Sequence, residues 1–165
     1  MKKVIILMIV VVTGYLLPAK AVIPVKDATK QDWHHDTYWY YPWGKSGVHK
    51  GIDIFAKKGT SVISSVSGIV LFNGNIALGG QVIAVLGPKW RIHYYAHLQS
   101  DNVHILEYVN RGEKIGRVGT TGNAVGKPPH LHYSVLSLIP NIGEITLEPQ
   151  GWKRMFYVNP THTFN

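Results

Sequence analysis

The chain has 165 residues, of which 45% are hydrophobic and 16% are charged, with no cysteine and a formal net charge of +8. This length suits a single domain built around one hydrophobic core. The lack of cysteine excludes disulfides, thiolate metal ligands and a lipid-modified cysteine, so any metal site must use His, Asp or Glu.

The first 21 residues have the pattern of a secretory signal peptide. Two lysines at positions 2 and 3 precede an apolar run at 4–17, and residues 18–21 read Pro-Ala-Lys-Ala, which supplies a small-x-small cleavage pattern. The run is shorter than the ~20 residues that a helix needs to cross a bilayer. We predict export to the periplasm, cell envelope or medium, with cleavage after residue 21. An uncleaved anchor, extended through residues 22–23, is the alternative.

The net charge of residues 22–165, which would remain after signal cleavage, indicates what kind of partner they could bind. Without Lys2, Lys3 and Lys20 the chain keeps 14 basic and 9 acidic side chains, a net charge of +5. This excess favours an anionic partner such as an acidic wall polymer, although the basic residues form no long run and an ordinary solvated surface explains them equally well. Export makes nucleic acid the least plausible partner. We expect a monomer without stable membrane insertion after cleavage.

Residues 22–47 form an aromatic lead-in without helical or strand periodicity. Its tryptophans and tyrosines are dense between residues 33 and 43. Such aromatic side chains either line a substrate groove or cover the edge of a core, and the second interpretation is favoured.

From residue 48 onward the chain consists of short segments rich in Val, Ile and Tyr, separated by glycines, which predict strands. Only residues 100–109 weakly favour a helix, and a loop from residue 140 precedes a closing strand near 155–158. The spacing predicts a mainly β fold, a single compact domain at residues 48–165 with an antiparallel sheet or sandwich. The predicted strands are 52–55, 61–64, 68–73, 81–86, 91–97, 114–118 and 130–138.

His130 and His132 lie two residues apart in a predicted strand. Side chains at this spacing point to the same face, about 6.6–6.8 Å apart along the strand. One ring can then bind a metal while the other reaches the water or substrate beside it. Pro128 and Pro129 stiffen the entry to this strand. An exposed strand face that carries two histidines is the alternative interpretation.

His49 and Asp53 lie four residues apart. A straight strand would separate them by roughly 13 Å, which forbids a shared ion. Gly51 and the β-branched residues 52 and 54 disfavour a helix, so the workable geometry is a tight bend at Gly51. An unrelated surface histidine and turn aspartate are the alternative.

Together the two clusters offer His49, Asp53 and His132, a three-ligand zinc set that leaves the fourth position open. An open position is typical of a catalytic zinc, whose bound water becomes a nucleophile near neutral pH. Such a site also needs a general base and a group that stabilises the oxyanion. His130 and His97 are the candidates for these two roles.

Four motifs resemble the lysostaphin-type zinc endopeptidases, also called LytM-like peptidases. They are H-K-G-I-D, T-S-V-x-S-x-x-S-G-I-V, Y-A-H-L and G-T-T-G-N-A-V-G-K-P-P-H-L-H-Y, and they follow the family's order and spacing from about Val48 to Leu136. The lead-in at residues 22–47 does not align with the family.

The resemblance implies a compact β fold with a zinc-bearing groove. It assigns one Zn²⁺ ion to His49, Asp53 and His132, and catalytic roles to His97 and His130. It implies a metalloendopeptidase whose partner is the peptide part of bacterial peptidoglycan. The alternative is a non-catalytic module of the same fold that binds the wall or activates another hydrolase.

The remaining histidines have no assigned role. His34 and His35 are expected at the surface, with a lid or a pair beside the site as the alternative. His93 shares strand parity with His97 and could face the groove, whereas His104 and His162 are expected at the surface.

Overall fold

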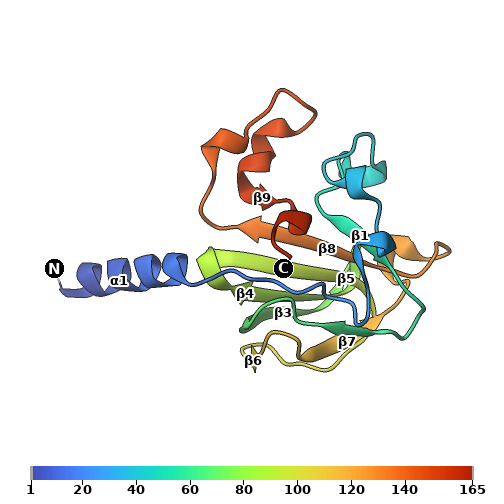
Figure 1. Cartoon of the computed structure of the whole chain (residues 1–165), viewed down its shortest axis with the longest axis horizontal. Helices are drawn as coiled ribbons and strands as arrows, with labels where there is room; N and C mark the ends of the chain where they lie inside the picture. The colour runs from blue at the N-terminus through green and yellow to red at the C-terminus, as the bar shows by residue number, and fades with distance from the viewer. Residues whose placement is uncertain (1, 165) are drawn as a thin grey trace.

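A computed structural model describes residues 2–164, in which nine strands form one antiparallel sheet (Figure 1). The main path of the sheet is β1-β8-β5-β4-β3-β6; β7 pairs with β5 and β2, and β9 pairs with β8. The prediction of a mainly β domain with an antiparallel sheet is confirmed. The strands are Ile52–Phe55 (β1), Ser61–Ile63 (β2), Gly68–Ile76 (β3), Gly80–Gly87 (β4), Arg91–Asp101 (β5), Tyr108–Val109 (β6), Lys114–Val118 (β7), His130–Ser137 (β8) and Tyr157–Val158 (β9).

Alternation of side chains along β1 and β8 separates the core from the opposite face of the sheet. Ile52 and Ile54 on β1 are fully buried in the core, as are Leu131 and Tyr133 on β8. The intervening residues point to the other face, because successive side chains of a strand alternate. The two strands pair so that Asp53 lies opposite His132. The polar positions of both strands therefore meet on one face.

The helix predicted over residues 100–109 is wrong. β5 continues to Asp101, and after a turn Tyr108 and Val109 form β6 against β3. The backbone N–H of Leu106 donates to the Val70 carbonyl at 2.8 Å, so β3 supplies the hydrogen-bond partners that a helix would have supplied internally. Pairing with a distant strand overrides the weak local preference.

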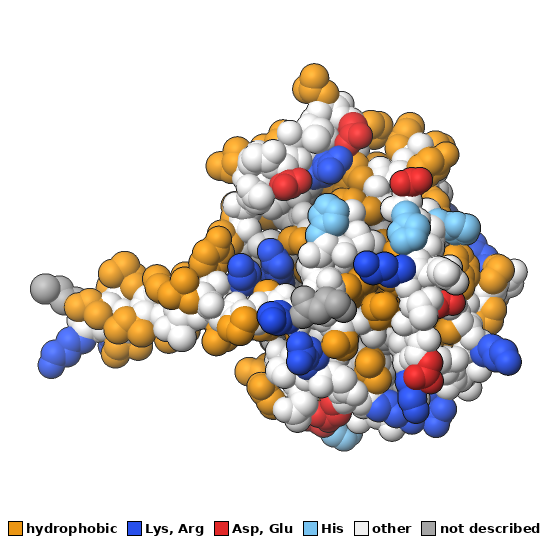
Figure 2. Space-filling view, viewed as in Figure 1, with side chains coloured by type: hydrophobic (Ala, Val, Ile, Leu, Met, Phe, Trp, Pro, Cys, Tyr) orange, Lys and Arg blue, Asp and Glu red, His pale blue; other side chains and the backbone are white. Residues whose placement is uncertain are grey.

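An α-helix, α1 (Lys2–Leu16), projects from the β domain at the N-terminal end (Figure 1). Its side chains are largely exposed, and hydrophobic side chains cover it in the space-filling view (Figure 2). It contacts the 3₁₀ turn η4 (Pro88–Trp90), where Trp90 Nε1 donates to the Val11 carbonyl at 2.8 Å. Between residues 2 and 164, no helix has the length and apolarity required to cross a membrane. The assignment of residues 1–21 to a signal peptide stays a prediction.

The lead-in is irregular and contains three 3₁₀ turns, η1 (Lys30–Asp32), η2 (His35–Thr37) and η3 (Gly44–Ser46). Trp33 and Trp39 are buried, with 4% and 6% of their surface exposed, and cover an edge of the core as expected. Backbone hydrogen bonds tie the segment to His49, because Trp39 N donates to the His49 carbonyl and His49 N donates to the Tyr40 carbonyl. The lead-in therefore helps to position His49, the first of the candidate metal ligands along the chain.

The C-terminal segment folds back over β8 (Figure 1). It contains the 3₁₀ turns η6 (Ile142–Glu144), η7 (Gly151–Phe156) and η8 (Pro160–His162), with β9 between the last two. Phe164 packs against Trp33 and stacks on Tyr133, with ring centroids 5.7 and 6.0 Å apart. The lead-in and the C-terminal segment therefore pack against the same part of the core.

Candidate metal and catalytic site

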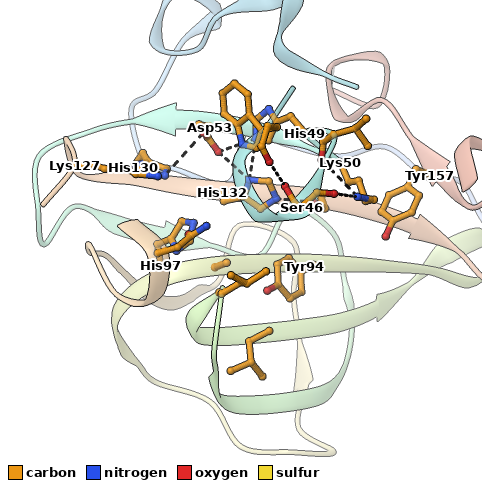
Figure 3. A pocket seen from close by; sticks show the side chains of 18 of the residues that line it. Ser46, His49, Lys50, Asp53, Tyr94, His97, Lys127, His130, His132 and Tyr157 are labelled. Atoms are coloured by element: carbon orange, nitrogen blue, oxygen red, sulfur yellow. Dashed lines mark hydrogen bonds and ion pairs between the residues drawn. The ribbon is translucent and has the colours of Figure 1, made fainter. Parts of the chain in front are cut away.

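A groove of about 680 Å³ crosses the face of the sheet opposite the core (Figure 3). Side chains from β1, β5 and β8 form its floor, and segments between the strands form its ends and walls. All five residues that the sequence nominated for the site line this groove. The groove lining includes Trp43, Lys50, Phe55, Tyr94, Lys127, Ser134 and Tyr157, together with His49, Asp53, His97, His130 and His132.

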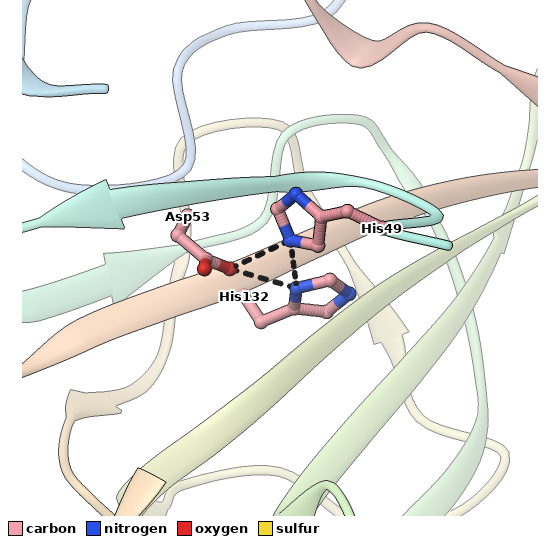
Figure 4. Close-up of side chains that lie close together, drawn as sticks. All are labelled: His49, Asp53 and His132. Carbon is pink, nitrogen blue, oxygen red and sulfur yellow. Dashed lines mark hydrogen bonds and ion pairs between the residues drawn. The ribbon is translucent and has the colours of Figure 1, made fainter. Parts of the chain in front are cut away.

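His49, Asp53 and His132 converge on one point (Figure 4). Nε2 of His49 lies 3.1 Å from Oδ1 of Asp53 and 3.1 Å from Nδ1 of His132. Nδ1 of His132 lies 2.8 Å from the same carboxylate oxygen. The pairing of β1 with β8 places Asp53 opposite His132, so two of the three donors are set by the sheet itself.

His49 reaches the other two residues because the chain bends at Gly51, as the sequence predicted. The requirement for glycine comes from close packing against β8, and Gly51 is absent from the residues with a positive φ. A Cβ atom at Gly51 would lie 2.4 Å from the Tyr133 carbonyl oxygen and 2.5 Å from Oγ of Ser134. The bend therefore lies directly on the strand that carries His132.

Hydrogen bonds on the outer side of each ring orient the two histidines. Nδ1 of His49 donates to the Thr37 carbonyl at 3.0 Å, since a carbonyl can only accept, and the neutral ring then keeps its lone pair on Nε2. Nε2 of His132 lies 2.9 Å from the Ser134 hydroxyl, which can accept its hydrogen and leave the lone pair on Nδ1. Trp43 stacks on His49 with ring centroids 4.1 Å apart. Such outer partners fix the tautomer and aim of metal-ligating histidines.

The donor set fits a divalent cation. Three lone pairs, from two imidazoles and one carboxylate, face one another at 2.8–3.1 Å, an arrangement that repels unless a positive charge lies between them. Burial raises the pKa of the Asp53 carboxyl, but the contacts with His132 and His49 outweigh burial and hold this pKa well below its ordinary value. Burial also lowers the pKa of His132. An ionised carboxylate beside neutral imidazoles is the form in which these groups bind zinc.

His97 lies at an irregularity in β5. Its φ is +64°, in the left-handed region that costs a non-glycine residue roughly 1–2 kcal/mol. Its backbone N–H leaves the β5 ladder and donates to the Gly79 carbonyl at 2.8 Å. As a result Ala96 and His97 both line the groove, although they are consecutive. Strained backbone at such a position is typical of functional sites.

His97 and His130 present bare ring nitrogens beside the three converging residues. Nδ1 of His97 donates to the Thr121 carbonyl at 2.9 Å, and Nδ1 of His130 donates to the Pro128 carbonyl at 2.8 Å. Each neutral ring therefore keeps its lone pair on Nε2, and Nε2 of His130 lies 4.0 Å from Oδ2 of Asp53. Burial, with the charges of two neighbouring histidines, lowers the pKa of His97 to about 4. A neutral ring at pH 7 can accept a proton.

The expectation that His93 could face the groove is wrong. His93 is buried in the core on the opposite side of β5, where Nδ1 lies 2.6 Å from the Tyr133 hydroxyl and 3.2 Å from the Ser65 hydroxyl. Parity failed because the irregular backbone at His97 turns its side chain onto the groove face that Ala96 already occupies, so His93 and His97 lie on opposite faces of β5. Burial, with a smaller effect of Arg91, lowers the pKa of His93 to about 3.

The other histidines lie where the sequence placed them. His34, His35, His104 and His162 are all exposed. None of these four lines the groove among the residues described. His34 packs edge-on against Phe55 with ring centroids 5.9 Å apart, which brings it near the rim.

Sequence reasoning missed several residues around the site. Ser134 continues the period of two that contains His130 and His132, so extending that pattern by one step would have found it. Tyr94 lines the groove without a sequence signal that separates it from neighbouring aromatic residues. Trp43 also lines it, which fits the alternative interpretation of the lead-in aromatic residues rather than the favoured one.

Comparison with known proteins agrees with the motifs. The family model described as peptidase family M23 matches residues 47–142. The L-Ala–D-Glu endopeptidase of Bacillus subtilis is 34% identical over an alignment of 115 residues that covers 64% of this chain and 35% of that protein. Peptidoglycan DD-endopeptidase ShyC of Vibrio cholerae is 33% identical over 93 residues, 56% of this chain and 21% of that protein. The chain thus spans about a third or less of the length of these two relatives.

A solved structure extends the likeness to three dimensions. The catalytic domain of lysostaphin from Staphylococcus simulans superposes with a TM-score of 0.54 at 34% identity, covering 58% of this chain and 73% of that one. The family model itself covers more than half of the sequence. The chain therefore belongs to peptidase family M23 and is of the lysostaphin type.

Proposed function

We propose that this protein is an exported zinc-dependent endopeptidase that hydrolyses peptide bonds in bacterial peptidoglycan. The observation that carries the proposal is the convergence of three lone pairs, from His49, Asp53 and His132, on one point in a groove. A binding module would need the groove but not this donor set.

In the proposed enzyme His49, Asp53 and His132 would hold one Zn²⁺ ion. When bound, zinc would supply an acidified water and polarise the carbonyl of the peptide bond. The Thr37 carbonyl and the Ser134 hydroxyl hold the two imidazoles in the required orientation, so the ligands are arranged before the metal arrives.

His97 and His130 would manage the proton. Their Nδ1 atoms are occupied by carbonyls, which leaves Nε2 as the atom that accepts or returns a proton in the groove. Their ring centroids lie 5.0 Å apart, so both could serve one bound peptide. The lowered pKa of His97 suits a group that is neutral when the substrate binds.

The substrate is inferred from the relatives and the family motifs. The named relatives act on an L-Ala–D-Glu bond and on peptidoglycan. Export follows from the signal-like residues 1–21, with residues 22–47 as the lead-in and 48–165 as the catalytic domain. N-terminal sequencing of protein recovered outside the cytoplasm tests that division, because a mature chain that begins at residue 22 is expected.

The function is tested on purified peptidoglycan sacculi. The zinc-loaded protein should release new amino termini, and His132→Ala should abolish this release. His104→Ala, which removes an exposed histidine outside the groove, serves as the matched control and should retain activity. If the loaded protein binds sacculi without producing amino termini, the alternative of a wall-binding or hydrolase-activating module is correct.

A further inference from the structure

The groove carries an uneven set of charges. Among the lining residues in the described part of the chain, Asp53 is the only carboxylate, whereas Lys50 and Lys127 are cationic. Asp53 is already directed at the two histidines of the metal site. The ends of the groove therefore present positive charge that no acidic lining residue offsets.

The two lysines lie at opposite ends of the site. The β1–β8 ladder runs from the pair Phe55–His130 at one end to the pair Ile52–Tyr133 at the other. Lys127 precedes β8, beyond the first pair, and Lys50 precedes β1, beyond the second. Figure 3 shows the same arrangement, with the labelled metal-site residues between Lys127 and Lys50.

Neither lysine has an anionic partner among the residues that the structure describes. The ion pairs found between residues 2 and 164 involve histidines or Arg154, and none involves a lysine. Nζ of Lys50 donates to the Ser46 carbonyl at 2.9 Å, and weakly to the Val48 carbonyl at 3.5 Å. These neutral acceptors fix the ammonium at the groove without cancelling its charge.

The positive charge continues beyond the Lys50 end. Tyr157 lines both the groove and a second cavity of about 460 Å³. Lys89, Arg91 and Arg154 line that cavity, and Glu144 supplies the single carboxylate among its described lining residues. Arg154 pairs with Glu148, but Lys89 and Arg91 form no ion pair among the described residues. A chain that leaves the groove past Tyr157 therefore meets further cations.

We propose that the groove selects an acidic peptide, with a carboxylate on each side of the cleaved bond, over a neutral peptide of the same length. Lys50 and Lys127 are the specificity-determining residues in this proposal, which rests on the proposed peptidase function. Apolar walls, including Phe55 and Leu136, reduce the dielectric screening between each ammonium and a bound carboxylate.

The size of the preference follows from the exposure of the two lysines. Lys50 is half-buried and Lys127 is exposed, so each pair with a carboxylate falls near the range measured for surface ion pairs. Such pairs change an affinity by roughly 1.4- to fivefold each. Two together give roughly twofold or more, and added salt should reduce the preference.

The test uses one cross-linked muropeptide dimer in two forms, either with free carboxylates or after conversion to carboxamides with carbodiimide and ammonium chloride. Dissociation constants are measured by calorimetry with the zinc-loaded His97→Ala protein, in which hydrolysis is suppressed. We expect the free-carboxylate dimer to bind at least roughly twofold more tightly. Lys50→Gln and Lys127→Gln should each remove part of this preference, and the double variant should remove it.

Lys26→Gln is the matched control, because Lys26 is exposed and does not line the groove. It should keep the full preference. Equal affinities for the two dimers, or a preference that survives in the double variant, would overturn the inference. Release of amino termini from sacculi by the unaltered protein is measured in parallel. Hydrolysis without a charge preference refutes only the role of the lysines, whereas a charge preference without hydrolysis refutes only the peptidase activity.

Discussion

The buried imidazole of His93 makes a prediction about stability that is independent of the metal site. His93 is 2% exposed, and its Nε2 atom has no hydrogen-bond partner among the described residues. Protonation of this ring in the folded state would therefore bury a charge, which is why its pKa falls from 6.5 to about 3. The perturbation is the substitution His93→Gln, which removes the titrating group and retains polar atoms near Ser65 and Tyr133.

The sign and magnitude follow from proton linkage. Below pH 6.5 the unfolded chain binds a proton at His93 that the folded chain does not bind. The free energy of unfolding therefore has its full value above pH 6.5, and the contribution of His93 is lost as the pH falls from 6.5 to about 3. Each pH unit within this window costs about 1.4 kcal/mol. Between pH 7 and pH 5 the loss due to His93 alone is about 2 kcal/mol.

The assay is urea unfolding followed by tryptophan fluorescence at pH 7, 6 and 5, with a chelator present so that the metal-site histidines behave alike in both proteins. The free energy of unfolding of the original protein, minus that of His93→Gln, should fall by about 2 kcal/mol between pH 7 and pH 5. Other titrating groups cancel in this difference. A difference that stays constant with pH would refute the buried, neutral state of His93.

Three further predictions concern the groove. Chelation of the metal should abolish hydrolysis while the far-ultraviolet circular dichroism spectrum stays unchanged, because the hydrophobic core lies on the face of the sheet opposite the metal site. Loss of the β-sheet spectrum on chelation would show that the fold depends on the metal. Ser134→Ala should weaken zinc affinity about 10- to 100-fold by freeing Nε2 of His132, measured by competition with a fluorescent chelator, and an unchanged affinity would refute the orienting role. Gly51→Ala should lower the free energy of unfolding by about 1–3 kcal/mol, because its Cβ would lie 2.4 Å from the Tyr133 carbonyl oxygen. An unchanged thermal unfolding temperature would contradict this and show that β8 can move to accommodate the methyl group.

Much of the sheet could be predicted because its local signals agree with its tertiary environment. β1 and β7 have the predicted bounds, since β-branched residues alternate in β1, Gly51 precedes it, and Gly119 follows β7. β3 and β5 extend beyond prediction, to Ile76 and Asp101. Their extra residues form hydrogen bonds with neighbouring strands, and a propensity argument cannot see those partners.

His49, Asp53 and His132 could be nominated from their spacing, their motifs and the bend that Gly51 permits. The groups that hydrogen-bond to the two imidazoles could not be predicted. The Thr37 carbonyl belongs to the irregular lead-in, where no periodicity indicates which backbone group faces His49. The face of His93 was misjudged because strand parity assumes regular backbone, and His97 adopts a positive φ. The two groove lysines are ordinary in sequence, and only the pairing of β1 with β8 shows that they lie at opposite ends of one site.

One zinc ion is proposed to be held by His49, Asp53 and His132. The most direct measurement is the zinc content per chain, determined by elemental mass spectrometry after zinc loading and gel filtration in metal-free buffer. We expect one zinc ion per chain in the original protein and in His104→Ala, and loss of that ion in Asp53→Ala with the fold retained by circular dichroism. If Asp53→Ala retains one zinc ion per chain, these three residues are not the zinc ligands.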